Sequence, residues 1–152
     1  MKILLTTDCY TPTVNGVVTS VLNLRRELMR QGHEVRVLTL AGTTRTFVQD
    51  GVTALGSIDM GRVYPGARLR SAFASEEIRS LIEWRPDVVH SQCEFSTYFL
   101  AVRIARACNA PLVHTYHTVY EDYTHYFSPS RRWGKTMARG LTRIVLSKAD
   151  AV

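Results

Sequence analysis

The sequence predicts an α/β domain with a Rossmann-like parallel sheet and helices on both of its faces. Short apolar runs alternate with amphipathic stretches along the chain, which is typical of right-handed βαβ units. The chain has 152 residues, 45% of them hydrophobic, so it is long enough for one buried core and too apolar for a disordered segment. No apolar run approaches the ~20 residues of a membrane span. The three cysteines are unpatterned, which favours a reducing cytoplasm over a disulfide framework.

The first third of the chain contains the signals for a strand, a helix and a second strand. Residues 2–7 are apolar but too short a run for a secretory signal, so they predict the first strand. After a polar loop at 8–15, a helix begins at Gly16 and ends at Gly32. Its apolar residues recur at helical spacing: Val17, Val21, Leu24 and Leu28. A second strand is expected at 34–40.

The remaining elements continue this alternation. Further strands are expected at 52–55, 86–91 and 111–115, and helices at 71–84, 96–108 and about 132–147. Ala151 and Val152 begin another strand, so we expect the chain to be a fragment of a longer protein or a truncated one.

The whole net charge of +6 lies in one segment. Between Arg131 and Lys148 there are six basic residues and no acidic one, whereas the rest of the chain has 13 of each sign. On a helical projection the apolar residues of this segment lie within about 120° of one another, and Lys135, Arg139 and Arg143 lie on the opposite face. The segment is therefore either an ordinary amphipathic helix on the core or a surface that binds an anionic membrane or phosphate. Nucleic acid is not favoured, because no recognition motif is present.

The loop before the first helix ends in Asn15 and Gly16. Backbone N–H groups at a helix start, with no Cβ in the way, bind an anion such as phosphate. The loop lacks the GxGxxG pattern, so a nicotinamide or flavin dinucleotide is not expected. The alternative interpretation is that Asn15 and Gly16 only cap the helix.

The strand at 111–115 leads into a dense polar and aromatic cluster, and ligands of α/β proteins bind at the carboxyl ends of strands. His90, His114 and His117 could hold a metal ion there, or could cap strand ends by hydrogen bonds, which is the more common arrangement. A neutral histidine also has one N–H to donate to a sugar or phosphate.

Two acids and four tyrosines complete this cluster. Glu121 and Asp122 could form an acid/base pair or could be plain surface acids. The tyrosines could stack on a sugar or lipid, or could fill the core: Tyr116, Tyr120, Tyr123 and Tyr126.

Four blocks of sequence together resemble glycosyltransferase family 4, whose members are retaining enzymes of the GT-B fold. The blocks are Asp8-x-Tyr10-x-Pro12-x-x-Asn15-Gly16-Val17-Val18, Gly32-His33-Glu34-Val35, Pro86-Asp87-Val88-Val89-His90-Ser91-Gln92-x-Glu94-Phe95, and His114-Thr115-Tyr116-His117-Thr118-x-Tyr120-Glu121-Asp122-Tyr123-x-His125-Tyr126. The last block is the most specific and is closest to the bacterial diacylglycerol glucosyltransferases. The resemblance covers nearly all of the chain, but only the N-terminal half of such an enzyme.

The resemblance implies that residues 1–152 form the N-terminal, acceptor-side domain of two Rossmann-like domains, and that the nucleotide-sugar domain is absent here. It implies that Asn15 and Gly16 lie near the donor phosphates and that His117 is a catalytic residue beside the transferred sugar. It implies an acceptor side formed by Glu94, Glu121, Asp122 and Tyr123. It also implies a membrane-docking surface formed by Arg131, Arg132, Lys135, Arg139 and Arg143.

The function implied by the resemblance is the transfer of a hexose to a lipid, such as glucose from UDP-glucose to diacylglycerol, with retention and without a metal or cofactor. The protein would be cytoplasmic and peripheral on the inner face of the cell membrane. The family's carboxylate pair and its phosphate-binding basic residues lie in the absent domain, so this chain alone is not expected to be active. Two alternatives stay open, namely a phosphatidylinositol-type mannosyltransferase and a non-catalytic domain that binds a membrane or partner.

Overall fold

The computed structural model describes residues 1–60, 68–70, 75–117 and 131–152, and within 131–141 it describes only the side chains of 136, 139 and 140. The strands of the main sheet are β1 (Lys2–Thr6), β2 (Glu34–Leu40), β3 (Phe47–Gln49), β4 (Val52–Leu55), β7 (Val88–Ser91) and β8 (Leu112–His114). Two short strands, β5 (Ile58–Asp59) and β6 (Arg68–Leu69), pair with each other in a second sheet. The helices are α1 (Gly16–Arg30), α2 (Glu76–Trp84), α3 (Ser96–Cys108) and α4 (Arg131–Leu146).

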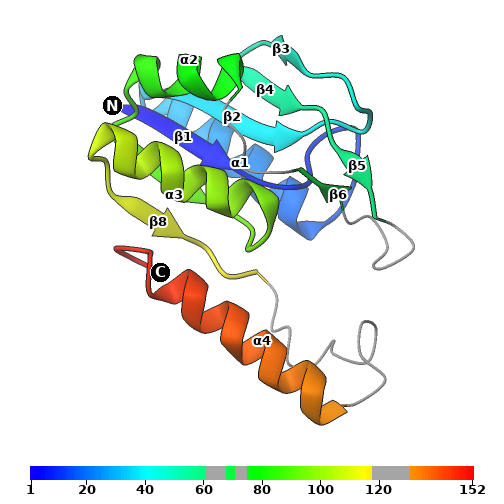
Figure 1. Ribbon diagram of the computed structural model, residues 1–152. Coiled ribbons are helices and arrows are strands. Elements are labelled where there is room, and N and C mark those ends of the chain that lie inside the picture. The colour runs from blue at the N-terminus through cyan, green and yellow to red at the C-terminus, as the bar shows by residue number, and fades with distance from the viewer. Residues whose placement is uncertain (61–67, 71–74, 118–130) are drawn as a thin grey trace.

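The predicted fold class is confirmed. The six strands of the main sheet lie in the order β3-β4-β2-β1-β7-β8, and every neighbouring pair is parallel except β3 with β4. Figure 1 shows α1 on one face of this sheet and α2 and α3 on the other. The predicted bounds of β2, β4 and α3 agree with the structure residue for residue.

Alternation along the strands supplies both faces of the sheet with apolar side chains. Ile3 and Leu5 of β1 pack with Val21 of α1 in one cluster. Leu4, between them, packs with Ile78 of α2 and other residues of α2 and α3 in a second cluster. The two clusters place a core on each face, which is why the helices cover both faces.

The helix expected at 71–84 begins only at Glu76, so its predicted start was wrong. Ser75 has an extended backbone, with φ −122° and ψ 165°, and its hydroxyl accepts a hydrogen bond from the N–H of Ile78 at 3.4 Å. Glu76 and Glu77 then occupy the first turn, where carboxylates interact favourably with the helix dipole. A serine followed by two glutamates is itself a helix-start signal.

The antiparallel strand β3 was not predicted. Asp50 and Gly51 connect β3 to β4, and both have positive φ, 49° and 74°. These are the backbone angles of the type I′ turn that joins hairpin strands, for which Asp-Gly is a preferred sequence. The signal was therefore present in the sequence.

Helix α4 is attached to the domain near its C-terminal end (Figure 1). Val145 is fully buried in the core cluster of α2 and α3, whereas its neighbour Ile144 is 46% exposed. After the helix, Ala151 forms a parallel bridge to Val113 of β8, so the strand expected at 151 begins as a bridge. Within the described ranges, no helix is both long enough and apolar enough to cross a membrane.

Candidate functional site

The carboxyl ends of the parallel strands meet at one edge of the sheet. From β1 the chain first adds β2 and β4 on one side, and later adds β7 and β8 on the other side. The order of the strands therefore reverses between β1 and β7. Such a switch point is where α/β sheets bind ligands. The segments that follow β1, β7 and β8 at this edge contain four predicted site residues: Asn15, Gly16, Glu94 and His117.

The start of α1 is exposed at this edge. Asn15 is the N-cap, and its Oδ1 accepts a hydrogen bond from the N–H of Val18 at 2.8 Å, so the capping interpretation is confirmed for its side chain. A Cβ added to Gly16 would meet no atom within 4 Å. Packing within the domain therefore does not require glycine there, and the space beside the first N–H groups of the helix is open to an anion.

Asp8 joins the segment after β1 to the start of α3. Its Oδ1 accepts a hydrogen bond from the N–H of Thr97 at 2.8 Å, across 89 positions of sequence. Burial raises the pKa of Asp8, although the bond from Thr97 partly opposes this. Cys93 lies beside them, with its Sγ 2.9 Å from Thr97 Oγ1, and burial raises the pKa of its thiol well above the usual value. The thiol stays protonated and is not a nucleophile.

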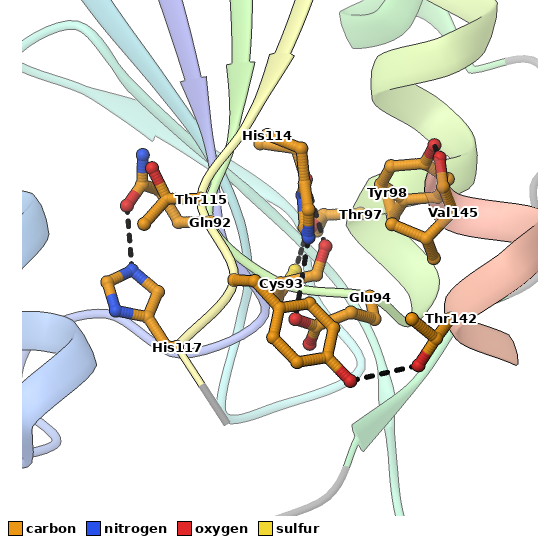
Figure 2. A network of polar contacts seen from close by, with 12 residues as sticks. Gln92, Cys93, Glu94, Thr97, Tyr98, His114, Thr115, His117, Thr142 and Val145 are labelled. Carbon is orange, nitrogen blue, oxygen red and sulfur yellow. Dashed lines mark hydrogen bonds and ion pairs between the residues drawn. The ribbon is translucent and has the colours of Figure 1, made fainter. Parts of the chain in front are cut away.

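His117 is half-buried and is directed toward the segment after β7 (Figure 2). Its Nε2 lies 2.8 Å from Oε1 of Gln92. Burial lowers the pKa of His117 below 6.5, and the nearby Glu94 carboxylate opposes this only in part. The ring is therefore mainly neutral at pH 7.

His90 lies in β7, one residue before its end, and is also held by a hydrogen bond. Its Nε2 lies 2.8 Å from Oγ1 of Thr115, which follows β8. Burial, with smaller contributions from His114 and His117, lowers the pKa of His90 to about 4. His90 thus forms the expected kind of hydrogen bond, but it joins the side chain of Thr115 and does not cap the end of β7. Within the described part of the chain, no group of three or more His, Cys, Asp or Glu side chains is placed to hold a metal ion.

Glu94 belongs to a buried network that the sequence did not reveal (Figure 2). Its Oε1 lies 3.5 Å from Nε2 of the buried His114, a contact that becomes an ion pair only if His114 is protonated. The rings of Tyr98 and Tyr116 meet His114 edge-on, with centroids 5.5 and 6.1 Å away. Because Glu94 is only 2% exposed, its predicted contact with an acceptor would need this network to rearrange.

The same network connects the site to α4. The hydroxyl of Tyr98 donates to the carbonyl oxygen of Val145 at 2.6 Å, and the hydroxyl of Tyr116 lies 3.0 Å from Oγ1 of Thr142. Tyr116 is the neighbour of His117 in the chain, so α3, the segment after β8 and α4 are coupled through hydrogen bonds.

Several predicted site residues cannot be placed. Glu121, Asp122 and Tyr123 lie outside the described residues, and so do the side chains of Arg131, Arg132 and Lys135 on α4. Arg139 and Arg143 of α4 are exposed. Gln92, Tyr98 and Thr142 were not among the predicted site residues, whereas Tyr116 was singled out only as a residue that could stack on a ligand or fill the core. For Gln92 a signal existed, because it is the polar residue directly after a buried strand.

Comparison with known proteins identifies related sequences. Residues 14–152 match the family described as Glycosyltransferase Family 4. The chain is 34% identical over 153 aligned residues to the alpha-monoglucosyldiacylglycerol synthase of Streptococcus pneumoniae, with 100% of this chain and 34% of that protein covered. It is 37% identical over 130 residues to the protein of the same name from Acholeplasma laidlawii, with 84% and 32% covered. The chain thus spans about a third of the length of these curated relatives.

Proposed function

This chain belongs to glycosyltransferase family 4, and on that premise we propose that it is the acceptor-side domain of an enzyme that transfers glucose from UDP-glucose to diacylglycerol. The choice of product follows the two relatives, both of which are named as synthases of alpha-monoglucosyldiacylglycerol. The structural observation that carries the proposal is the presence of an exposed helix start and a neutral histidine at one switch-point edge.

In this proposal, the start of α1 faces the donor phosphates. The N–H groups of its first turn carry the positive end of the helix dipole, which favours a diphosphate. The open space at Gly16 supports a close approach of the backbone to that group. The basic residues and carboxylates of the second domain would complete the donor site, so this domain alone should transfer no sugar.

His117 would orient the transferred sugar. Retaining transfer passes through a transition state in which positive charge develops on the sugar ring, and a fixed hydrogen bond to a sugar hydroxyl holds that ring in the reactive geometry. The anchoring of His117 to Gln92 supports this role, because the ring is held from a residue whose backbone is paired with β1. Glu121, Asp122 and Tyr123 would meet the lipid acceptor.

The exposed basic residues of α4 support a membrane surface as partner. A segment with six basic residues and no acid would be attracted to anionic lipid by about 1 kcal/mol for each charge near the surface. This surface would hold the enzyme on the inner face of the cell membrane, where its lipid acceptor lies.

Substrate competition in the full-length protein tests this function. Labelled UDP-glucose and GDP-mannose should each be offered with diacylglycerol or phosphatidylinositol in vesicles that contain anionic lipid. We expect glucose to appear on diacylglycerol with an α linkage. Preferential transfer of mannose to phosphatidylinositol would replace the proposal with the mannosyltransferase alternative. Vesicle binding without transfer from either donor would favour a non-catalytic binding domain.

A further inference from the structure

Gln92 is the buried polar residue to which His117 is attached. It follows β7 directly, is only 2% exposed, and its backbone N–H donates to the carbonyl oxygen of Thr6 at 2.8 Å. The backbone of Gln92 therefore extends the pairing of β7 with β1. A side chain that starts from the centre of the sheet is a rigid support for a residue on a connecting segment.

The chemistry of the contact determines where the proton of His117 lies. Oε1 of Gln92 can only accept a hydrogen bond, so Nε2 of His117, at 2.8 Å, must donate. A neutral imidazole has one ring N–H, and here that N–H is used by Gln92. The other nitrogen, Nδ1, is then an acceptor. This differs from the sequence-based expectation that His117 offers a donor to its ligand.

Stability does not explain a glutamine at this position. The Nε2 of Gln92 is buried and has no hydrogen-bond partner among the described residues. A buried donor without a partner costs folding free energy. An apolar side chain of similar length would avoid that cost, so the amide is better explained by its contact with His117 than by the folding of the domain.

We propose that Gln92 is a positioning residue that holds His117 in the Nε2–H form and thereby presents Nδ1 as an acceptor for a hydroxyl of the transferred sugar. The inference rests on the proposed function of His117 and makes it more specific. An acceptor nitrogen attracts a hydroxyl, which can donate, and disfavours a phosphate oxygen, which cannot. His117 therefore contacts the sugar part of the donor, and the phosphates are left to the start of α1.

The protonated nitrogen of His117 can be measured directly. The full-length protein labelled with nitrogen-15 in histidine should be studied by NMR, with the His117 signals assigned by their loss in His117→Ala. We expect the unmodified protein to show a proton on Nε2 and none on Nδ1. A ring that is protonated on Nδ1 would overturn the inference, because Gln92 would then present its nitrogen and not its oxygen. This measurement needs no variant of Gln92 to fold.

Two substitutions of Gln92 separate positioning from packing. Gln92→Met keeps the length and removes the acceptor, so we expect His117 to lose its single protonated form and turnover to fall roughly tenfold to a hundredfold, with little change in the KM for UDP-glucose. Gln92→Glu keeps the acceptor, so the proton of His117 should stay on Nε2. The added negative charge should raise the pKa of His117 and move the acid limb of the pH profile of turnover to higher pH. Gln49→Met, on the exposed strand β3, is the matched control and should leave both measurements unchanged.

The outcomes distinguish this inference from the function on which it rests. Unchanged His117 signals and unchanged turnover in Gln92→Met would overturn the positioning role while leaving the glycosyltransferase intact. Normal turnover in His117→Ala would overturn the sugar-orienting role of His117 and the positioning role of Gln92 together, whereas an unmodified protein that transfers no glucose would overturn the proposed function itself. The inference requires that turnover falls in Gln92→Met and that Gln92→Glu keeps its turnover at pH values above its raised acid limb. It also requires that the neutral ring of His117 keeps its proton on Nε2 in Gln92→Glu and loses this single form in Gln92→Met.

Discussion

Replacement of His90 by glutamine should remove much of the loss of stability that the domain suffers in mild acid. His90 is neutral in the folded protein, where burial lowers its pKa to about 4, whereas an ordinary histidine has a pKa of 6.5. Between these two values the unfolded chain binds a proton that the folded domain does not bind. The free energy of unfolding therefore falls as the pH falls from 6.5 toward about 4, and it is restored as the pH rises.

The size of this effect follows from the two pKa values. At about 1.4 kcal/mol for each pH unit, the full difference corresponds to about 3 kcal/mol. Because the ring is only partly buried, screening by solvent reduces the expected contribution to roughly 2 kcal/mol. Glutamine does not titrate and can still form a hydrogen bond to Thr115, so His90→Gln removes the proton-linked part with little change in the contact itself.

Urea unfolding of both proteins at several pH values between 6.5 and about 4 measures the difference. We expect the curves of the two proteins to diverge by roughly 2 kcal/mol across this window, with the unmodified protein losing more stability. Parallel curves would refute the claim that His90 is held neutral by burial. A titration of the His90 ring by NMR gives the same pKa independently of unfolding.

Four further changes test other parts of the structure. Gly16→Ala should weaken the binding of UDP-glucose by roughly tenfold or more, measured by calorimetry, with little change in stability. Gly56→Ala should instead destabilise the domain by more than about 1–3 kcal/mol, measured by thermal unfolding, because its Cβ would lie 2.0 Å from the carbonyl oxygen of Thr44. Tyr98→Phe should cost about 1–2 kcal/mol of unfolding free energy, because it leaves the buried carbonyl of Val145 without its 2.6 Å hydrogen bond, and an unchanged urea midpoint would contradict that role. Changing Lys135, Arg139 and Arg143 together to Glu should remove most binding to anionic vesicles, and the binding of the unmodified protein should weaken as salt rises. The same change at three scattered exposed arginines should have a smaller effect: Arg26, Arg45 and Arg79. Co-sedimentation that does not depend on lipid charge would contradict the membrane proposal.

The parts of the fold that could be predicted are those determined by short stretches of sequence. The apolar run of β2 and the helical spacing of α3 are local patterns, and both elements have their expected bounds. The start of α2 and the β3 hairpin were also local signals, Ser-Glu-Glu and Asp-Gly, and were predictable in principle. The pairing of β5 with β6 was not, because it joins Ile58 to Leu69 and is secured by a hydrogen bond from Arg68 to Ser57.

The same division applies to the site. Gly16 and His117 could be singled out because each lies next to a recognisable strand or helix boundary. The contact between Gln92 and His117 spans 25 positions and forms only because β7 and β8 are neighbours in the sheet. The burial of Glu94 against His114 likewise depends on how α3 packs on β8, which no local pattern encodes. Sequence spacing predicts which residues reach the edge, and packing determines which of them stay exposed there.

The most direct test of the account is the turnover of the full-length protein after His117→Ala. With UDP-glucose and diacylglycerol in anionic vesicles, we expect turnover to fall by roughly 10²–10³-fold, a loss of about 3–4 kcal/mol in transition-state stabilisation. The domain should remain folded, because the ring is half-buried and lies outside the apolar core. His33→Ala is the matched control, since His33 lies between α1 and β2 at the opposite edge of the sheet, and it should keep normal turnover. Near-normal turnover in His117→Ala would contradict the central claim that this edge of the sheet orients the transferred sugar.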